Sequence, residues 1–202
     1  MLRAGPVTAI ARLLGIAAVT LLLIWVLRFR EGLAFKSSNK FKIFNDKKFS
    51  SVMAYKTMPG SRIVQKFFHM TFHLIALLAG ILGVYAAFKF HRETDLPDMF
   101  TFHSWLGMAT ICLFALQWLF GFFSYWFPGA EMPFRTRFLP WHAFFGLGIF
   151  LMAICSVETG VVQKFASLGL RHEKEAYVLN FTGVAILLFG LAVAFTTVLP
   201  RY

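Results

Sequence analysis

The stretch Phe67–Phe88, FFHMTFHLIALLAGILGVYAAF, decides the fold of this chain. It contains no Asp, Glu, Lys or Arg, and it has the roughly 20 residues that a helix needs to cross the hydrocarbon core of a bilayer. Leu13–Leu27 is shorter, but it spans if the flanking arginines reach the two interfaces. Three further stretches are as long and apolar as Phe67–Phe88 and could each cross the bilayer: His103–Phe127, Phe138–Val157 and Ala176–Leu199. The sequence therefore predicts an all-α, polytopic transmembrane helix bundle with five apolar helices.

The composition agrees with a membrane protein and disfavours a soluble domain. Hydrophobic residues make up 58% of the chain, charged residues only 14%, and 26 residues are Phe. Cys112 and Cys155 lack CxxC spacing, so we interpret them as buried small hydrophobes and expect neither a disulfide nor a zinc site. We detect no internal repeat. We expect one domain over 1–202, with helices at about 7–28, 67–89, 103–127, 138–158 and 176–199.

The formal charge of +11 is concentrated in one segment. Arg28–Lys66 has ten Lys or Arg against two acidic residues, a net charge of +8. Basic residues beside membrane spans favour a cytosolic, lipid-facing loop over a nucleic-acid footprint, so we expect no nucleic-acid partner. Because spans alternate in direction, the positive-inside rule places His69 and His142 at the cytosolic face and His103 at the opposite face.

The histidines at the helix ends are the candidate functional residues. An imidazole at the edge of a lipid-buried helix is costly unless something binds it. We expect His69 and His142 at similar depth on two parallel helices, which is the arrangement that a bis-histidine haem requires. His73, one turn deeper on the face of His69, is a rival ligand or a supporting partner. The alternative for each is an interfacial anchor, and the many aromatic residues suit an ordinary aromatic belt equally well.

Several short motifs occur in order along most of the chain: Gly32-Leu33-Ala34, Phe44-Asn45, Lys66-Phe67-Phe68-His69, Lys89-Phe90-His91, His103-Ser104-Trp105-Leu106-Gly107, Gln117-Trp118 and Leu139-Pro140-Trp141-His142. With these motifs the chain resembles the eukaryotic cytochrome b561 family, and more narrowly the plant transmembrane ascorbate ferrireductases. The resemblance implies a six-helix bundle with two non-covalent b haems, one near each membrane face. It also implies electron transfer from cytosolic ascorbate to monodehydroascorbate or ferric chelates on the other side.

The resemblance assigns roles to seven side chains. It implies that the cytosolic haem is held by His69 and His142, and that one ligand of the other haem is His103. It implies a basic cytosolic ascorbate site made by Lys66, Arg62 and Arg135. It implies that His91 lies at the substrate site on the non-cytosolic side. The alternative for the three cations is plain interfacial anchoring.

The chain departs from the family at its second helix. There the family has x-His-Pro after Phe-Asn, followed by a full apolar helix that carries the second ligand of the non-cytosolic haem. Here Lys47 and Lys48 replace that pair, and 46–55 is a truncated remnant too short to span. We therefore expect His103 to lack its partner and one haem b to remain, at the cytosolic side. Losing one span also requires the first helix to invert, placing Met1 outside, or to lie on the membrane.

The leading hypothesis is an ascorbate-dependent transmembrane oxidoreductase of the ferric-chelate reductase type, impaired by the missing ligand. The alternative is a haem-poor, non-catalytic membrane variant that packs with intact family members or modulates them. A transporter is disfavoured because the spans lack a relay of charged residues. The expected partners are the lipid bilayer, ascorbate, and monodehydroascorbate or ferric chelates, in an endomembrane (vacuolar) or the plasma membrane. A homodimer, the physiological acceptor and the origin of the missing helix stay open.

Overall fold

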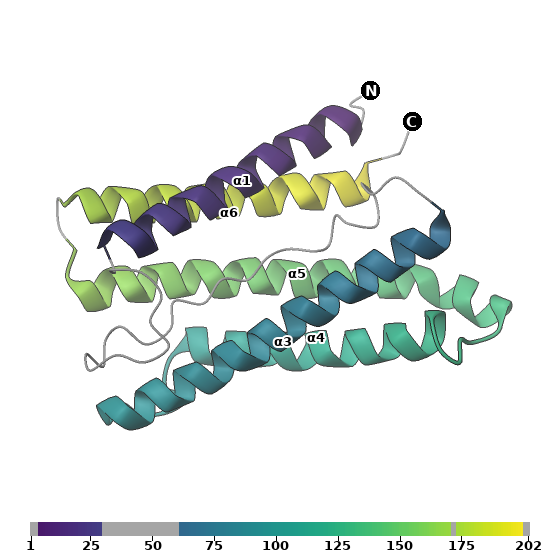
Figure 1. Cartoon of the computed structure of the whole chain (residues 1–202), viewed down its shortest axis with the longest axis horizontal. Helices are drawn as coiled ribbons and strands as arrows, with labels where there is room; N and C mark the ends of the chain where they lie inside the picture. Colours follow the sequence, from purple (N-terminus) through teal and green to yellow (C-terminus); the bar gives the residue numbers. More distant parts are fainter. Residues whose placement is uncertain (1–3, 30–60, 171–172, 200–202) are drawn as a thin grey trace.

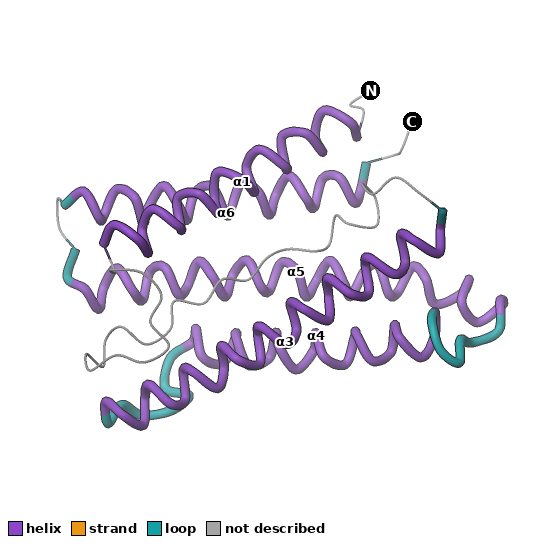
Figure 2. Tube along the Cα trace, in the orientation of Figure 1, coloured by secondary structure: helices purple, strands orange, loops and turns teal. Residues whose placement is uncertain are grey.

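The computed structural model describes residues 4–29, 61–170 and 173–199, and all regular structure in these ranges is helical (Figures 1 and 2). Each helix is long and apolar enough to cross a membrane, which confirms the predicted polytopic helical bundle. The helices are α1 (Ala4–Phe29), α3 (Arg62–Thr94), α4 (Phe102–Tyr125), α5 (Met132–Leu168) and α6 (Lys174–Val198).

The described helices form a chain of neighbours. α1 packs on α6, α6 on α5, α5 on α4, and α4 on α3, which crosses it obliquely (Figure 1). α1, α3 and α5 begin at one end of the bundle, where α4 and α6 finish (Figure 1). We call this end the Arg62 end, and the opposite one, where α3 finishes and α4 begins, the Thr94 end.

α3 and α5 extend well beyond the apolar stretches that predicted them. α3 begins after Ser61, whose Oγ accepts a hydrogen bond from the Val64 amide, and it finishes at Asp95 in the left-handed conformation. α5 has a proline in its first turn, where a missing N–H costs nothing, and Gly169 caps its other end at φ +60°. The predicted bounds followed hydrophobicity, whereas the backbone ladder continues until a capping residue stops it.

α1 has neither of the two arrangements predicted for it, inverted across the membrane or lying on its surface. Ala11, near its start, shares a buried cluster with Val193 near the end of α6, and Trp25 shares another with Leu179 near the start of α6. α1 therefore runs antiparallel to α6 along its length, and Phe29 lies at the Thr94 end while α3 begins at the opposite end (Figure 1). The prediction from counting spans is wrong because it gave no weight to the packing of α1 on α6. Residues 46–55 lie outside the described residues.

Much of the large apolar surface faces outward, as lipid-facing helices require, since lipid tails are as apolar as a protein core. The buried core lies mainly between α1, α5 and α6. Cys112 and Cys155 are both exposed, so the prediction that they are buried is wrong. Apolar flanking sequence identifies an apolar environment, but it does not distinguish a protein interior from lipid.

Candidate functional site

His69 on α3 and His142 on α5 lie side by side near the Arg62 end. Their ring centroids are 6.5 Å apart, with the ring planes at 71°. Both side chains are partly buried between the helices. The structure therefore brings together the two histidines that the topology argument placed at one membrane face.

This spacing suits one metal ion held between the two rings. An imidazole nitrogen binds a metal at about 2 Å, and the ring centre lies roughly 1 Å beyond it, so two axial rings have centroids roughly 6 Å apart. The 6.5 Å separation of His69 and His142 agrees with that value. The two residues thus fit the bis-histidine ligation of a haem iron.

His73 lies one turn beyond His69 on the same helix face. The two rings are in edge contact at 4.2 Å, and the His73 ring also packs on Phe114 of α4 at 5.5 Å. The ring in contact with His142 at 6.5 Å is that of His69. The geometry therefore favours His69 as the ligand and His73 as a packing partner behind it.

His142 is held by groups of α4. The Gln117 Nε2 donates to the His142 carbonyl oxygen at 2.8 Å and lies 3.0 Å from the ring Nδ1. The ring lies against Gly121, where a Cβ would approach its Cε1 to 3.1 Å. Tyr125 packs beside it with ring centroids 5.3 Å apart. The imidazole orientation is thus determined by a polar contact, a glycine and an aromatic ring.

The predicted ascorbate-binding cations also lie at the Arg62 end. Arg62 and Lys66 lie in the first turns of α3, and neither side chain makes a hydrogen bond or ion pair within the described residues. Arg135 lies in the first turn of α5, and its Nε donates to the carbonyl oxygen of Ala130 in the preceding loop. Trp126, in the same loop, packs near Phe67 at 6.2 Å. Arg135 therefore stabilises this loop in addition to any role in binding.

His103 lies at the Thr94 end, in the first turn of α4. Its Nδ1 is 2.9 Å from the carbonyl oxygen of Ser156 and 3.4 Å from the Thr159 hydroxyl. Because a carbonyl oxygen can only accept, this contact requires the proton on Nδ1 and leaves the Nε2 lone pair for another partner. Within the described ranges no second histidine ring contacts it. Lys47, which the resemblance matches to the position of its partner, lies outside those ranges.

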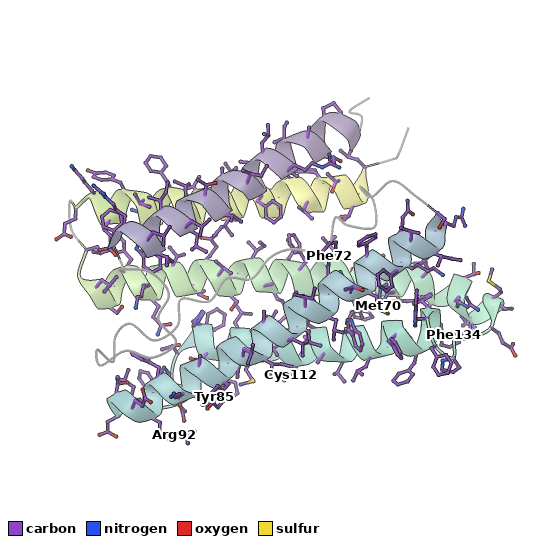
Figure 3. All side chains as sticks on the ribbon, in the orientation of Figure 1. Met70, Phe72, Tyr85, Arg92, Cys112 and Phe134 are labelled. Atoms are coloured by element: carbon purple, nitrogen blue, oxygen red, sulfur yellow. The ribbon has the colours of Figure 1, made fainter. Side chains whose placement is uncertain are left out.

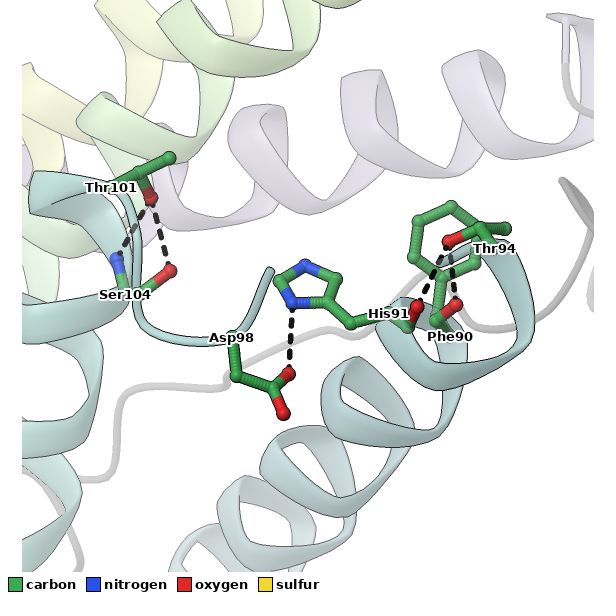
Figure 4. Close-up of polar contacts among 6 residues, drawn as sticks. All are labelled: Phe90, His91, Thr94, Asp98, Thr101 and Ser104. Atoms are coloured by element: carbon green, nitrogen blue, oxygen red, sulfur yellow. Dashed lines mark hydrogen bonds and ion pairs between the residues drawn. The ribbon is translucent and has the colours of Figure 1, made fainter. Parts of the chain in front are cut away.

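His91 also lies at the Thr94 end, in the last turn of α3. Its Nδ1 is 3.2 Å from a carboxylate oxygen of Asp98 in the loop that leads to α4 (Figure 4). In the same loop, the Thr101 hydroxyl accepts from the Ser104 amide at 3.3 Å and caps α4 (Figure 4). The sequence reasoning did not identify Asp98, and its spacing of seven residues across a loop gives no periodic signal.

The structure also shows a repeat that the sequence reasoning missed. α4 carries His103, Gly107, Gln117 and Gly121, and α5 carries His142, Gly146, Ser156 and Gly160 at the same spacings. In this antiparallel pair each histidine ring lies against the last glycine of the other set. Each Nδ1 contacts the residue four positions before that glycine, Gln117 or Ser156. The signal that could have revealed this repeat is the pattern His-x3-Gly with a second glycine fourteen positions later, about four helical turns.

The fold and this site define a multi-pass helical membrane protein that pairs histidines from two helices near one end of its bundle. Residues 49–168 match the family model described as eukaryotic cytochrome b561. A probable ascorbate-specific transmembrane electron transporter of Oryza sativa is 39% identical over 98% of this chain and 92% of its own. A transmembrane ascorbate ferrireductase of Arabidopsis thaliana is 36% identical over 96% and 92%. The chain belongs to the eukaryotic cytochrome b561 family, and membership implies a b-type haem.

Proposed function

We propose that this protein is an ascorbate-dependent oxidoreductase that moves electrons from the Arg62 end of the bundle through a b haem. The observation that carries the proposal is the pairing of His69 with His142 at 6.5 Å, at the end where Lys66, Arg62 and Arg135 gather. The relatives from rice and Arabidopsis carry names that describe the same activity. Electrons are delivered to ferric chelates or monodehydroascorbate at the Thr94 end.

His69 and His142 would hold the iron from α3 and α5. A b haem supplies a one-electron carrier whose potential depends on its axial ligands and their hydrogen bonds. The protein provides two imidazoles on separate helices, with the His73 and Tyr125 rings beside them. These aromatic groups exclude water and limit the rotation of the ligand rings.

The ascorbate site lies one turn before the ligand on α3. Ascorbate is an anion at neutral pH, so cations at the mouth of the site raise its local concentration. Lys66 precedes His69 by three residues, and Arg62 lies one turn further out, near the positive end of the α3 dipole. Arg135 keeps four guanidinium N–H groups beyond the one bound to Ala130. We assign the Arg62 end to the cytosol.

At the Thr94 end, His91 would contact the electron acceptor and His103 would be the remaining ligand of a second haem. We propose that this second haem is absent or weakly bound, because the family position of its other ligand holds Lys47. His103 lies fourteen residues from Gln117, roughly 21 Å along α4, so it cannot replace a ligand at the Arg62 end. A chain with one haem retains the reaction with cytosolic ascorbate and is impaired in transfer across the membrane.

The test is a reduced-minus-oxidised absorption spectrum of the full-length protein in detergent, with haem measured per chain. One haem that ascorbate reduces is the expected result. His69→Ala and His142→Ala should each remove it, and His103→Ala should leave it in place. A chain that binds no haem would instead support the non-catalytic variant. Two haems per chain would refute the proposal that the second haem lacks a ligand. Loss of the haem in His103→Ala would refute the proposal that His69 and His142 hold it.

A further inference from the structure

The two helices that carry the paired histidines do not pack on each other. Within the described residues α3 packs on α4 alone, and α4 packs on both α3 and α5. The 6.5 Å gap between the His69 and His142 rings is therefore set indirectly, by how each helix packs on α4. Whatever fixes α3 and α5 to α4 near these rings determines whether the pair fits one iron.

On the α5 side the contact is made by Gln117. Its amide approaches both the backbone carbonyl and the ring Nδ1 of His142. Two glycines line this contact. A Cβ at Gly121 would be a tight 3.1 Å from the His142 ring, whereas one at Gly146 would be 3.6 Å from the Gln117 Nε2, an ordinary contact distance. Gln117 thus lies against Gly146, one turn after His142, and His142 lies against Gly121, one turn after Gln117. These two contacts fix the register of α4 and α5.

On the α3 side the contact is made by the next residue, Trp118. Its indole Nε1 donates to the carbonyl oxygen of Met70 at 3.2 Å, directly after His69 in the sequence. Met70 is labelled on α3 in Figure 3. The indole also stacks on Phe122, one turn further along α4, with centroids 5.4 Å apart and planes at 15°. Trp118 is therefore held in place on its own helix while it holds the backbone of α3.

We propose that Gln117 and Trp118 are the positioning residues that set the spacing and ring orientation of the His69–His142 pair. Neighbouring positions on a helix point about 100° apart, so adjacent residues can reach two different helices. Gln117 fixes the ligand on α5 and Trp118 fixes the ligand-bearing turn of α3. This inference rests on the proposed function, because it takes the pair as the haem ligands.

Gln117 also contacts the Nδ1 of His142, the ring atom whose protonation defines the tautomer. At the equivalent place in the repeat, a backbone carbonyl accepts from the Nδ1 of His103 and allows only the tautomer protonated there. The Gln117 amide can donate through Nε2 or accept through Oε1, so it permits either tautomer. If iron were bound through Nε2 of His142, the proton would be on Nδ1. The Gln117 amide would then have to turn so that Oε1 accepts this proton, and it would give up the bond from Nε2 to the His142 carbonyl. Loss of such a partner typically weakens metal binding by about 10- to 100-fold.

Two substitutions at Gln117 test this role with haem binding as the readout. Haem is stripped from the full-length protein in detergent, and the apoprotein is titrated with hemin. Gln117→Leu should bind hemin about 10- to 100-fold more weakly, whereas Gln117→Glu, which keeps an acceptor for Nδ1–H, should bind close to the unaltered affinity. The midpoint potential should rise in Gln117→Leu, because His142 becomes a weaker donor to iron. If both variants lose affinity equally, the residue acts only through the backbone carbonyl and the tautomer argument fails.

The Trp118 contact is tested separately. Trp118→Phe keeps the stack on Phe122 but removes the donor to Met70. We expect partial conversion of the low-spin ferric electron paramagnetic resonance signal to a high-spin signal, because His69 is no longer held at bonding distance. Leu116→Ala is the matched control, since that side chain is 62% exposed on the same turn of α4. A low-spin signal unchanged in Trp118→Phe would overturn the role of this residue.

These outcomes separate the inference from the proposed function. If the unaltered protein fails to bind hemin with a bis-histidine spectrum, the proposed function fails first. If it binds hemin and Gln117→Leu binds equally well, only the positioning role is refuted. Circular dichroism melting of each variant identifies loss of folding, and Gln117→Glu retains a hemin readout if Gln117→Leu does not fold.

Discussion

Alanine substitutions at three glycines provide a direct test of how the histidines are packed. A Cβ at Gly160 would lie 2.9 Å from the Cε1 of His103, and one at Gly121 would lie 3.1 Å from the Cε1 of His142. Gly148, on the same helix as Gly160, has no atom within 4 Å of the added Cβ. Gly148→Ala is therefore the matched control for the two crowded positions.

The expected energies follow from two opposing effects. Alanine in place of glycine favours a helix by roughly 0.5–1 kcal/mol, and this gain applies at all three positions. Carbon atoms normally approach to about 3.5–4.0 Å, so the added methyl groups at the two crowded positions must displace a ring. Such overpacking costs about 1–3 kcal/mol. Gly148→Ala should be stabilising, and Gly160→Ala should be about 1–3 kcal/mol less stable than Gly148→Ala.

The assay is thermal unfolding of each variant in detergent, followed by the haem absorption spectrum at low temperature. The energy difference corresponds to a melting temperature roughly 2–12 °C lower for Gly160→Ala than for Gly148→Ala. Gly121→Ala should also change the haem spectrum, because it displaces the ring of His142, whereas Gly160→Ala should not. A spectrum altered equally by Gly121→Ala and Gly160→Ala would refute the assignment of the haem to the Arg62 end. A destabilised Gly148→Ala would refute the packing argument itself.

Three further predictions concern single side chains. Lys66→Ala should raise the ascorbate concentration that reduces half of the haem by about 5- to 10-fold at low salt and less at high salt, with haem content unchanged. Arg137→Ala, on an exposed side chain at the same end, should have a smaller effect in the same titration. His73→Phe should keep a low-spin haem, and loss of that signal in resonance measurements would make His73 the ligand. Trp25→Phe should lower the free energy of unfolding by about 1–3 kcal/mol, measured by thermal melting, because buried Glu175 loses its 2.9 Å indole donor.

The histidine pairing shows how far sequence reasoning reached at the site. The alternation of spans and the positive-inside rule placed His69 and His142 at one face, and the structure has their rings 6.5 Å apart. Depth in a membrane is almost a linear function of position along an apolar helix, so the sequence encodes it directly. The choice between His69 and His73 is different, because the two lie one turn apart on the same face of α3. The position of α3 along its axis, which its packing on α4 determines, decides which of them lies level with His142.

The orientation of α1 and the contacts that hold the paired histidines depended on segments distant in the sequence. Trp25 and Glu175 are 150 residues apart, and no local pattern connects them. Gln117 and Trp118 were recognised only as part of a motif, and their partners on α5 and α3 appear once the helices are packed.

The sequence by itself determined that this chain is a bundle of membrane helices, which family it resembles and which histidines share a face. Those properties follow from the free energy of transferring residues to lipid, which is summed along each segment. Only the tertiary structure decided that α1 runs antiparallel to α6 and that α4 packs on both helices that carry the paired histidines. Those properties depend on side-chain packing between helices, where lipid and protein surfaces are equally apolar and hydrophobicity gives no direction.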